Sequence, residues 1–320
     1  MSGQKSRLRL GWLGAGRMGF AMASRLASAG NDVAVWNRTR AKAEPLTSSG
    51  AAIVDKISDL ADRDVVFTVV GNSADFEDVT TGPSGLLSFP GKAPGIIVDH
   101  STVSVEASTR VAAAASKRGC TLLCAPVSGN AHVVAAGTAS LMVSGPRAAF
   151  EEVEPYMLQV VQGVTYLGEG AVARVVELAH NAFLGGIIAT LVEVTALAEK
   201  AGVPRATFLQ VINASPLGSR FTKYKTPALV NLDYTPTFTT RLLRKDLELA
   251  LAEARRLEVP MSTVALVDQA LQSAIGQGFD EVDFAALLEV QARGSRIKLS
   301  SENVEYAEGV QAGRQGLRRH

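Results

Sequence analysis

The sequence predicts an α/β domain with a mostly parallel sheet, joined by a long interdomain helix to an all-helical C-terminal domain. Three observations lead to this prediction. Short apolar segments alternate with helical patterns through the first half of the chain, a long helical pattern runs from Gly170 to Gly202, and the patterns that follow are all helical. Alternation of this kind is typical of a parallel sheet whose faces are covered by helices.

The chain is long enough for two domains, because it has 320 residues and a single hydrophobic core rarely grows beyond about 250 residues. We expect a first domain at residues 1–169 and a second at residues 170–298, with the interdomain helix at residues 170–201. Apolar periodicity fades after about Gly294. Residues 299–320 are therefore expected to form a poorly ordered tail.

The composition excludes several classes of protein. Apolar residues make up 47% of the chain and the net charge is +1, so no basic field indicates binding to nucleic acid or to an anionic membrane. Cys120 and Cys124 form neither a disulfide framework nor a metal framework, and the four histidines lack metal-ligand spacing. No long apolar segment follows the N-terminal charges, so we expect no signal peptide. These features predict a cytoplasmic protein without a metal ion.

A glycine-rich turn separates the first predicted strand, Leu8–Leu13, from the first predicted helix, Phe20–Ala29. A second strand is expected at Val33–Trp36. In this context the first glycine of a GxGxxG motif permits a tight turn, the second lets the backbone approach a pyrophosphate, and the third lets helix and strand pack closely. The expected dinucleotide-binding loop consists of Gly14, Ala15, Gly16, Arg17, Met18 and Gly19. The alternative is a glycine-rich turn without a ligand.

The end of the second strand bears on the choice of dinucleotide. NAD-binding domains usually carry Asp or Glu there to hold the ribose hydroxyls. This chain instead has Asn37-Arg38-Thr39-Arg40 and no carboxylate. Because a guanidinium group suits a phosphate, we expect NADP(H) in preference to NAD(H), with Arg38 as the main contact and Asn37 and Thr39 beside it. The alternative is that these are solvated surface charges.

Polar or small residues follow several later strands. These strands are expected at Asp64–Val70, Ile96–Asp99, Thr121–Cys124 and Ser140–Val143, with helices at Phe76–Thr80 and Val105–Arg118. In a parallel sheet, ligands bind at the carboxyl ends of the strands. We therefore expect one crevice lined by Val70, Gly71, Thr102, Ser128, Gly129 and Asn130.

The long helix carries one formally charged side chain between Val175 and Val192, that of Glu177, and Asn181 lies on the same side at helical spacing. A buried carboxylate is costly unless it has a partner or a task. The uncharged run is shorter than the roughly 18 residues of a membrane span, so we expect a core helix and no membrane partner. Further helices are expected at Arg205–Asn213, Arg241–Leu257, Ser262–Gln277 and Phe284–Val290.

Several further motifs stand in order along the chain. They are Asp99-His100-Ser101-Thr102, Ala125-Pro126-Val127-Ser128-Gly129, Met142-Val143-Ser144-Gly145, Ala198-Glu199-Lys200-Ala201-Gly202 and Lys245-Asp246-Leu247. With the glycine loop, they resemble the β-hydroxyacid dehydrogenase family. That family includes 3-hydroxyisobutyrate dehydrogenase, glyoxylate/succinic semialdehyde reductases and 6-phosphogluconate dehydrogenase, with imine reductases as relatives.

The resemblance covers about residues 8–292. It implies a Rossmann domain, a long helix and an all-helical domain. It also implies NAD(P)-dependent oxidoreductase activity on a small-molecule substrate and assembly into homodimers or homotetramers. Lys245 would then reach the cofactor or the substrate.

The chain departs from this family at the catalytic lysine. In the family, that lysine protonates the carbonyl oxygen, and an asparagine one turn later helps to hold the substrate. One register places Asn181 on the asparagine and Glu177 on the lysine. A second register would place Arg174 on the lysine and Leu178 on the asparagine. We adopt the first register, because it needs no gap within the helix.

The replacement of lysine leaves three functions open. We expect hydride transfer between the nicotinamide and a small carbonyl or alcohol substrate, with Glu177 and Asn181 as catalytic residues. Imine reduction is the alternative, because an ionised glutamate donates a proton poorly at pH 7 but stabilises a positively charged iminium. A catalytically silent dinucleotide-binding module is the third possibility, because the lysine is lost. For Glu177 itself, the alternative is an inert carboxylate in an interdomain salt bridge with Arg174 or a distant lysine.

Overall fold

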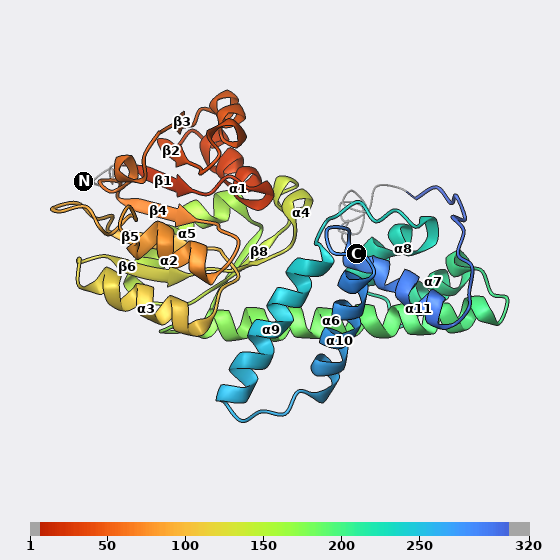
Figure 1. The fold of residues 1–320 in the computed structure, drawn as a ribbon. Coiled ribbons are helices and arrows are strands. Elements are labelled where there is room, and N and C mark those ends of the chain that lie inside the picture. The colour runs from red at the N-terminus through yellow and green to blue at the C-terminus, as the bar shows by residue number, and fades with distance from the viewer. Residues whose placement is uncertain (1–6, 307–320) are drawn as a thin grey trace, which may run out of the picture. The chain divides into compact units, whose positions relative to one another are not determined.

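The computed structural model describes residues 7–306 of the chain. The chain divides into two compact units, residues 1–178 and 179–320, which Figure 1 shows with the element labels used below. The division falls inside the helix α6 (Val172–Lys200). The domain boundaries expected from the sequence stay a prediction.

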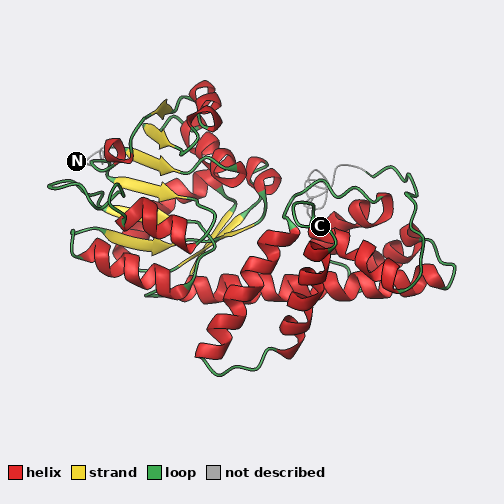
Figure 2. Ribbon diagram, in the orientation of Figure 1, coloured by secondary structure: helices red, strands yellow, loops and turns green. Residues whose placement is uncertain are grey.

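The first unit is built on a six-stranded sheet with the order β3-β2-β1-β4-β5-β6, in which every pair is parallel (Figure 2). This is the strand order of a Rossmann domain, and it confirms the predicted fold class. The strands are β1 (Leu10–Leu13), β2 (Val33–Trp36), β3 (Ala52–Ile53), β4 (Val65–Thr68), β5 (Ile96–Asp99) and β6 (Thr121–Cys124). The helices are α1 (Arg17–Ser28), α2 (Ser73–Thr81), α3 (Val105–Ser116), α4 (Ala131–Ala135) and α5 (Arg147–Val160), with 3-10 turns at Arg40–Lys42, Glu44–Ser49 and Ile57–Leu60.

The side chains of successive strand residues point alternately to the two faces of the sheet, and they pack into one apolar cluster on each face. Trp12 and Phe67, which are register partners, pack with residues of α1 and α5. Their neighbours Leu13 and Val66 pack with residues of α2 and α3. Because both faces are covered, the strands read as short continuous apolar runs.

A second, three-stranded sheet completes the first unit. Its strands are β7 (Val127–Ser128), β8 (Ser140–Val143) and β9 (Gly163–Tyr166). β8 pairs antiparallel with β7 and parallel with β9. This small sheet carries the Ser128-Gly129 segment that the sequence places near the substrate.

The second unit is all-helical. It contains the greater part of α6, followed by α7 (Arg205–Ala214), α8 (Arg220–Asn231), α9 (Thr240–Arg256), α10 (Ser262–Gly276), the 3-10 turn Phe284–Ala286 and α11 (Leu287–Gly294). Among the described residues, α6 is long and apolar enough to cross a membrane by length and composition alone. Leu191 of α6 nevertheless packs with Leu243 of α9 and Leu271 of α10 in one core.

Several elements were not among those expected from the sequence, namely β3, β7, β9, α4, α5 and α8. Three of these are very short, with two to five residues. The helices α5 and α8 each contain an internal proline, Pro155 and Pro227. Proline disfavours a helix interior locally, so the burial of these helices has overridden the local preference.

The expectation of a poorly ordered tail from residue 299 onward is wrong for residues 299–306. Leu299 and Val304 pack against the core of the helical unit. The carboxylate of Glu302 accepts hydrogen bonds from the backbone N–H groups of Arg205 and Ala206, at 2.7 and 3.0 Å. These partners lie almost a hundred positions away in sequence, so no local pattern reports them. The rest of the expected tail, residues 307–320, lies outside the described residues.

Candidate functional site

The glycine loop has the geometry that a dinucleotide needs. Gly14 has a φ of +100°, and its N–H donates to the carbonyl of Trp36 at 2.9 Å. A Cβ on Gly14 would lie 2.1 Å from the carbonyl oxygen of Val69, and one on Gly19 would lie 2.0 Å from that of Gly14. Both positions therefore require glycine.

Gly16 differs from its two neighbours in the motif. A Cβ there would meet no heavy atom within 4 Å, and its φ of −67° suits any residue. The space beside Gly16 is therefore open, and it lies at the N-terminus of α1, whose first N–H groups have no partners within the helix. The residues present fit the pyrophosphate of a dinucleotide, with Arg17 and Met18 opening the helix.

Asn37 links this loop to the residues after β2. Its side-chain oxygen accepts a hydrogen bond from the Ala15 N–H at 2.8 Å, and its amide nitrogen donates to the carbonyl of Thr39 at 2.8 Å. Asn37 thus fixes the backbone on both sides of Arg38.

Two arginines after β2 differ in their surroundings. The Arg38 side chain is 82% exposed, and its guanidinium lies 3.4 Å from the Asp75 carboxylate. Arg40 pairs with Asp55 at 2.5 Å and with Glu44 at 3.4 Å. Arg40 thus has two carboxylate partners, whereas Arg38 has one, Asp75, and is the more exposed of the two.

The carboxyl ends of β4 and β5 are joined by a buried polar cluster. Asp99 accepts hydrogen bonds from the hydroxyls of Thr68 at 2.5 Å and Ser101 at 2.7 Å. The Ser101 hydroxyl also accepts a hydrogen bond from the backbone N–H of Val70 at 2.9 Å. The structure thus brings together two strand ends that were expected to line one crevice, those at Val70 and Thr102.

Arg174, in the first turn of α6, completes this cluster and is fully buried. Its guanidinium forms an ion pair with Asp99 and donates to the carbonyl of Ser101 at 2.5 Å and the hydroxyl of Ser108 at 3.0 Å. A buried guanidinium needs such partners to offset the loss of hydration.

Glu177 lies one turn after Arg174 and is buried. Its Oε1 accepts a hydrogen bond from the Thr102 hydroxyl at 2.5 Å, and its Oε2 lies 3.8 Å from Arg174 Nη1. Thr102, Arg174 and Glu177 are therefore close together within the first unit. A hydrogen-bond donor and a fixed cation beside Glu177 suit an ionised carboxylate.

The expected substrate segment adopts a turn between β7 and α4. Gly129 has a φ of +142°, which favours glycine. The side-chain oxygen of Asn130 accepts hydrogen bonds from the N–H groups of His132 and Val133, at 3.0 and 3.1 Å. Asn130 is thus the N-cap of α4, and the expected substrate roles of Ser128, Gly129 and Asn130 stay predictions.

In the second unit, Asn181 is held by a buried carboxylate. Its amide nitrogen donates to Asp246 at 2.8 Å, and Lys245 lies 3.1 Å from the same side chain. Burial raises the pKa of Asp246, whereas Lys245 and the Asn181 amide act in the opposite direction. The expected site residues Asn181 and Lys245 are therefore joined through Asp246.

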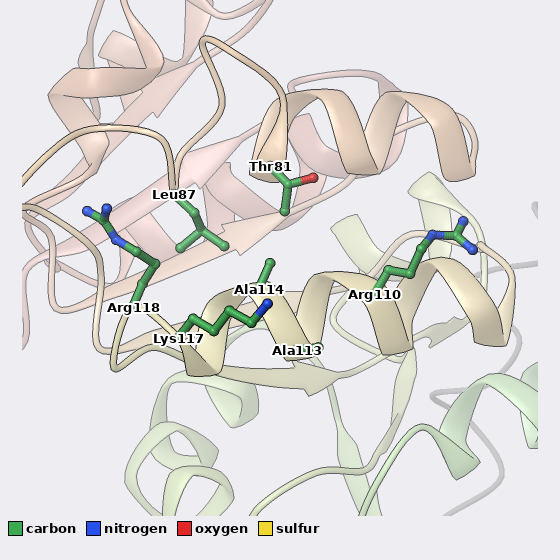
Figure 3. A pocket seen from close by; sticks show the side chains of 7 residues that line it. All are labelled: Thr81, Leu87, Arg110, Ala113, Ala114, Lys117 and Arg118. Atoms are coloured by element: carbon green, nitrogen blue, oxygen red, sulfur yellow. The ribbon is translucent and has the colours of Figure 1, made fainter.

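A shallow hollow of about 410 Å³ lies between α3 and the C-terminal end of α2 (Figure 3). Arg110 and Arg118 stand at opposite ends of it, with Ala114 and Lys117 between them. Arg110 pairs with Glu77 at 2.5 Å, and Arg118 donates to two backbone carbonyl groups. Both arginines thus have structural partners, and the hollow contains none of the expected site residues.

Sequence reasoning missed the roles of Asp99, Ser101 and Asp246, and treated Arg174 only as an alternative register and as a possible partner of an inert Glu177. A signal was present for the first two, because polar residues directly after a buried strand mark the ligand edge of a parallel sheet. The pairing of Asp246 with Asn181 joins residues 65 positions apart. Only the fold shows that contact.

Two family models together match almost the whole described chain. The model of the NAD binding domain of 6-phosphogluconate dehydrogenase matches residues 9–168. The model of the NAD-binding region of NADP-dependent 3-hydroxyisobutyrate dehydrogenase matches residues 168–291. A probable 3-hydroxyisobutyrate dehydrogenase-like protein of Arabidopsis thaliana is 30% identical over 300 residues, 93% of this chain and 89% of that protein.

Solved structures agree with these matches. A 3-hydroxyisobutyrate dehydrogenase from Salmonella typhimurium has a TM-score of 0.79 and 26% identity, and the similarity covers 88% of this chain and 99% of that one. Psf3 in complex with NADP+ and 2-OPP has a TM-score of 0.78, 26% identity and the same coverage. An imine reductase from Pseudomonas sp., with a TM-score of 0.59, 24% identity and coverage of 89% and 99%, shares the fold. The chain belongs to the β-hydroxyacid dehydrogenase family of NAD(P)-dependent oxidoreductases.

Proposed function

We propose that this protein is an NADPH-dependent oxidoreductase acting on a small carbonyl or alcohol substrate, with Glu177 in place of the family lysine. The observation that carries the proposal is the hydrogen bond from Thr102 to Glu177 at 2.5 Å. Thr102 follows β5 at the carboxyl edge of the sheet, where ligands of such folds bind. A buried carboxylate at this edge can exchange a proton with a substrate oxygen.

The preference for NADP(H) rests on Arg38. This side chain is exposed beside the glycine loop, and the sequence supplies no carboxylate at the end of β2 that would hold a ribose hydroxyl. The similarity to Psf3, whose structure contains NADP+, supports the same choice.

When bound, the reduced nicotinamide supplies the hydride. The chain's own residues supply the binding and the proton. Gly14, Gly16 and Gly19 shape the pyrophosphate site, and Val70, Gly71 and Thr102 lie at the strand ends that line it. Ser128-Gly129 and Asn181 are assigned to the substrate, and Lys245 to the cofactor or the substrate, by their place in the family motifs. Glu177 accepts or returns the proton.

A second candidate function is the reduction of a C=N bond. The specific observation that favours it is the distance of 3.8 Å between Arg174 and Glu177. A nearby cation favours the ionised form of a carboxylate, and an iminium substrate needs a counter-ion and no proton donor. Carbonyl chemistry stays the first choice, because Ser128-Gly129 is retained and the family relatives are named dehydrogenases.

The test is the rate of NADPH consumption with a panel of aldehydes, keto acids and cyclic imines. We expect turnover of neutral carbonyl compounds by the wild type, and a loss of about 10²-fold or more in kcat for Glu177→Gln, as for removal of a general acid or base. Glu177→Lys should shift activity towards hydroxyacid substrates. Unchanged rates in both variants would remove Glu177 from the mechanism.

Binding of NADPH with no turnover across the whole panel would instead support the catalytically silent module. Turnover confined to cyclic imines would favour the second candidate.

We further propose that the protein associates with a second copy of itself. In the second unit, Phe183 and Leu197 of α6 and Leu266 of α10 are large apolar side chains that are exposed in the single chain. Burying such side chains is favourable. Light scattering coupled to size-exclusion chromatography should give at least twice the mass of one chain, and a monomer at micromolar concentration would contradict this proposal.

A further inference from the structure

We propose that Arg174 is the positioning residue of this site: it holds Glu177 as a carboxylate against the Thr102 hydroxyl. The inference rests on the proposed function of Glu177 in the direction of alcohol oxidation, in which the carboxylate accepts the proton of the substrate hydroxyl while the hydride leaves to the oxidised nicotinamide. It assigns a role to a side chain that the family motifs do not include.

The first step is that Arg174 is itself immobile. It is fully buried, and all three of its guanidinium nitrogens have partners within the first unit. Nη2 faces the Asp99 carboxylate, Nη1 donates to the Ser101 carbonyl, and Nε donates to the Ser108 hydroxyl. The planar guanidinium therefore has one orientation, and arginine keeps its charge at any pH of interest.

The second step is that Arg174 determines the place of Thr102. The Ser101 carbonyl, which belongs to the peptide bond leading into Thr102, is held by Arg174 at 2.5 Å. The Ser101 hydroxyl is tied to Val70 and Asp99. Both the carbonyl group and the side chain of Ser101, the residue before Thr102, are thus held in place. The Thr102 hydroxyl donates to Glu177 Oε1.

The third step concerns the charge on Glu177. Its second oxygen lies 3.8 Å from Nη1 of the same guanidinium. In a buried site, a fixed positive charge at this distance stabilises the carboxylate over the neutral acid. The negative charge of Asp99 is stabilised by two hydroxyl groups as well as by Arg174. The positive charge of Arg174 therefore still acts on Glu177. One arginine therefore fixes both partners of the Thr102–Glu177 hydrogen bond.

The experiment removes the buried ion pair without leaving an isolated charge. The double variant Asp99→Asn/Arg174→Met is made in the wild type and in a Glu177→Gln background. A further variant, Arg174→Lys, keeps the positive charge but lacks the planar guanidinium group with its several N–H donors. A matched control, Asp283→Asn/Lys225→Met, removes another buried ion pair, at 2.6 Å, in the second unit. For each protein, kcat and KM for the best substrate, the Kd for NADPH and the melting temperature are measured.

If Arg174 acts through Glu177, the double variant lowers kcat about tenfold or more in the wild type and by less than about twofold in Glu177→Gln. KM and the Kd for NADPH change little, Arg174→Lys recovers part of kcat, and the control leaves kcat unchanged. An equal fold-loss in both backgrounds means a purely structural role and overturns the proposal, as does no loss at all.

A second readout does not depend on turnover. Infrared difference spectra between each protein and its Glu177→Gln counterpart at pH 7 report the state of Glu177. We expect a carboxylate band in the wild type and a protonated carboxyl band in the Asp99→Asn/Arg174→Met variant. The same band in both proteins would refute the role of Arg174. Absence of turnover in the wild type, with these spectra as expected, would refute only the proposed function.

Discussion

At the scale of single residues, the loop after β2 separates two arginines that look equivalent in sequence. Asn37 fixes the backbone on both sides of Arg38 through Ala15 and Thr39. Arg38 remains exposed, whereas Arg40 is paired with two carboxylates. The same residue type therefore has different surroundings within three positions.

Substitution of Arg38 should separate the two dinucleotides. A hydrogen bond to a charged group contributes about 1.5–3 kcal/mol, so Arg38→Ala should raise the Kd for NADPH by about 10- to 100-fold. The Kd for NADH should change little, because NADH has no 2′-phosphate. Fluorescence titration measures both constants. Arg40→Ala is the matched control, and an equal loss of NADPH affinity in the two variants would contradict the assignment to Arg38.

At the scale of elements, the turn between β1 and α1 contains glycines that are needed for different reasons. Gly19 is required by packing, because a Cβ there would lie 2.0 Å from the carbonyl oxygen of Gly14. Gly16 has open space beside it and an ordinary φ. The fold therefore tolerates a side chain at Gly16, and only a bound pyrophosphate would not.

Gly16→Ala and Gly19→Ala should accordingly have opposite effects. We expect Gly16→Ala to keep or slightly raise the melting temperature, since alanine restricts the unfolded chain, and to weaken NADPH binding by about tenfold or more. Gly19→Ala should cost about 1–3 kcal/mol of stability through overpacking. Calorimetry and NADPH titration decide this, and undiminished NADPH binding by Gly16→Ala would argue against a pyrophosphate at this turn.

The helix α7 is capped from a distant part of the chain. Its N-cap residue, Pro204, offers no side-chain hydrogen bond, and the Glu302 carboxylate binds the N–H groups of the first turn instead. A carboxylate at a helix N-terminus satisfies orphan donors and interacts favourably with the helix dipole.

Loss of this cap should destabilise the helical unit. We expect Glu302→Ala to lower its free energy of unfolding by about 1–2 kcal/mol, and Glu305→Ala, at an exposed position of the same segment, to have little effect. Urea unfolding followed by far-UV circular dichroism measures the change. Both tryptophans, Trp12 and Trp36, lie in the first unit, so their fluorescence transition serves as an internal control. Equal stability of the two variants would mean that the cap contributes nothing.

At the scale of the whole molecule, stability should depend on the ionisation of one buried histidine. His100 stacks with Trp12 and Phe67, at ring-centroid distances of 5.9 and 5.8 Å, and its Nδ1 lies 2.6 Å from the Ala125 carbonyl. Burial lowers the pKa of His100 to about 4, although the Ala125 carbonyl and Asp99 act in the opposite direction.

The sign of the effect follows from proton uptake. Between pH 6.5 and 4 the unfolded chain binds a proton at His100 and the folded protein does not, so the free energy of unfolding falls as the pH falls through this range. The loss is about 3 kcal/mol by pH 4 and about 2 kcal/mol between pH 7.5 and 5. Urea midpoints from tryptophan fluorescence at pH 7.5 and 5 measure it. His100→Gln, which keeps a donor for Ala125, should show a smaller difference between the two pH values. An unchanged difference would assign the pH dependence to other groups.

The sequence by itself determined the class of fold and the nucleotide loop. The alternation of strands with helices, the glycine spacing and the long helical pattern from Gly170 to Gly202 are local patterns, and each arises from backbone geometry that a few neighbouring residues set. The resemblance to the family rested on motifs in order along the chain. Only the tertiary structure showed that Arg174 contacts Asp99 and Ser101 and that Thr102 donates to Glu177. It also showed that Asp246 binds Asn181 and that Glu302 caps α7. The physical reason is that these contacts join side chains far apart in sequence, and their geometry is set by the packing of whole elements.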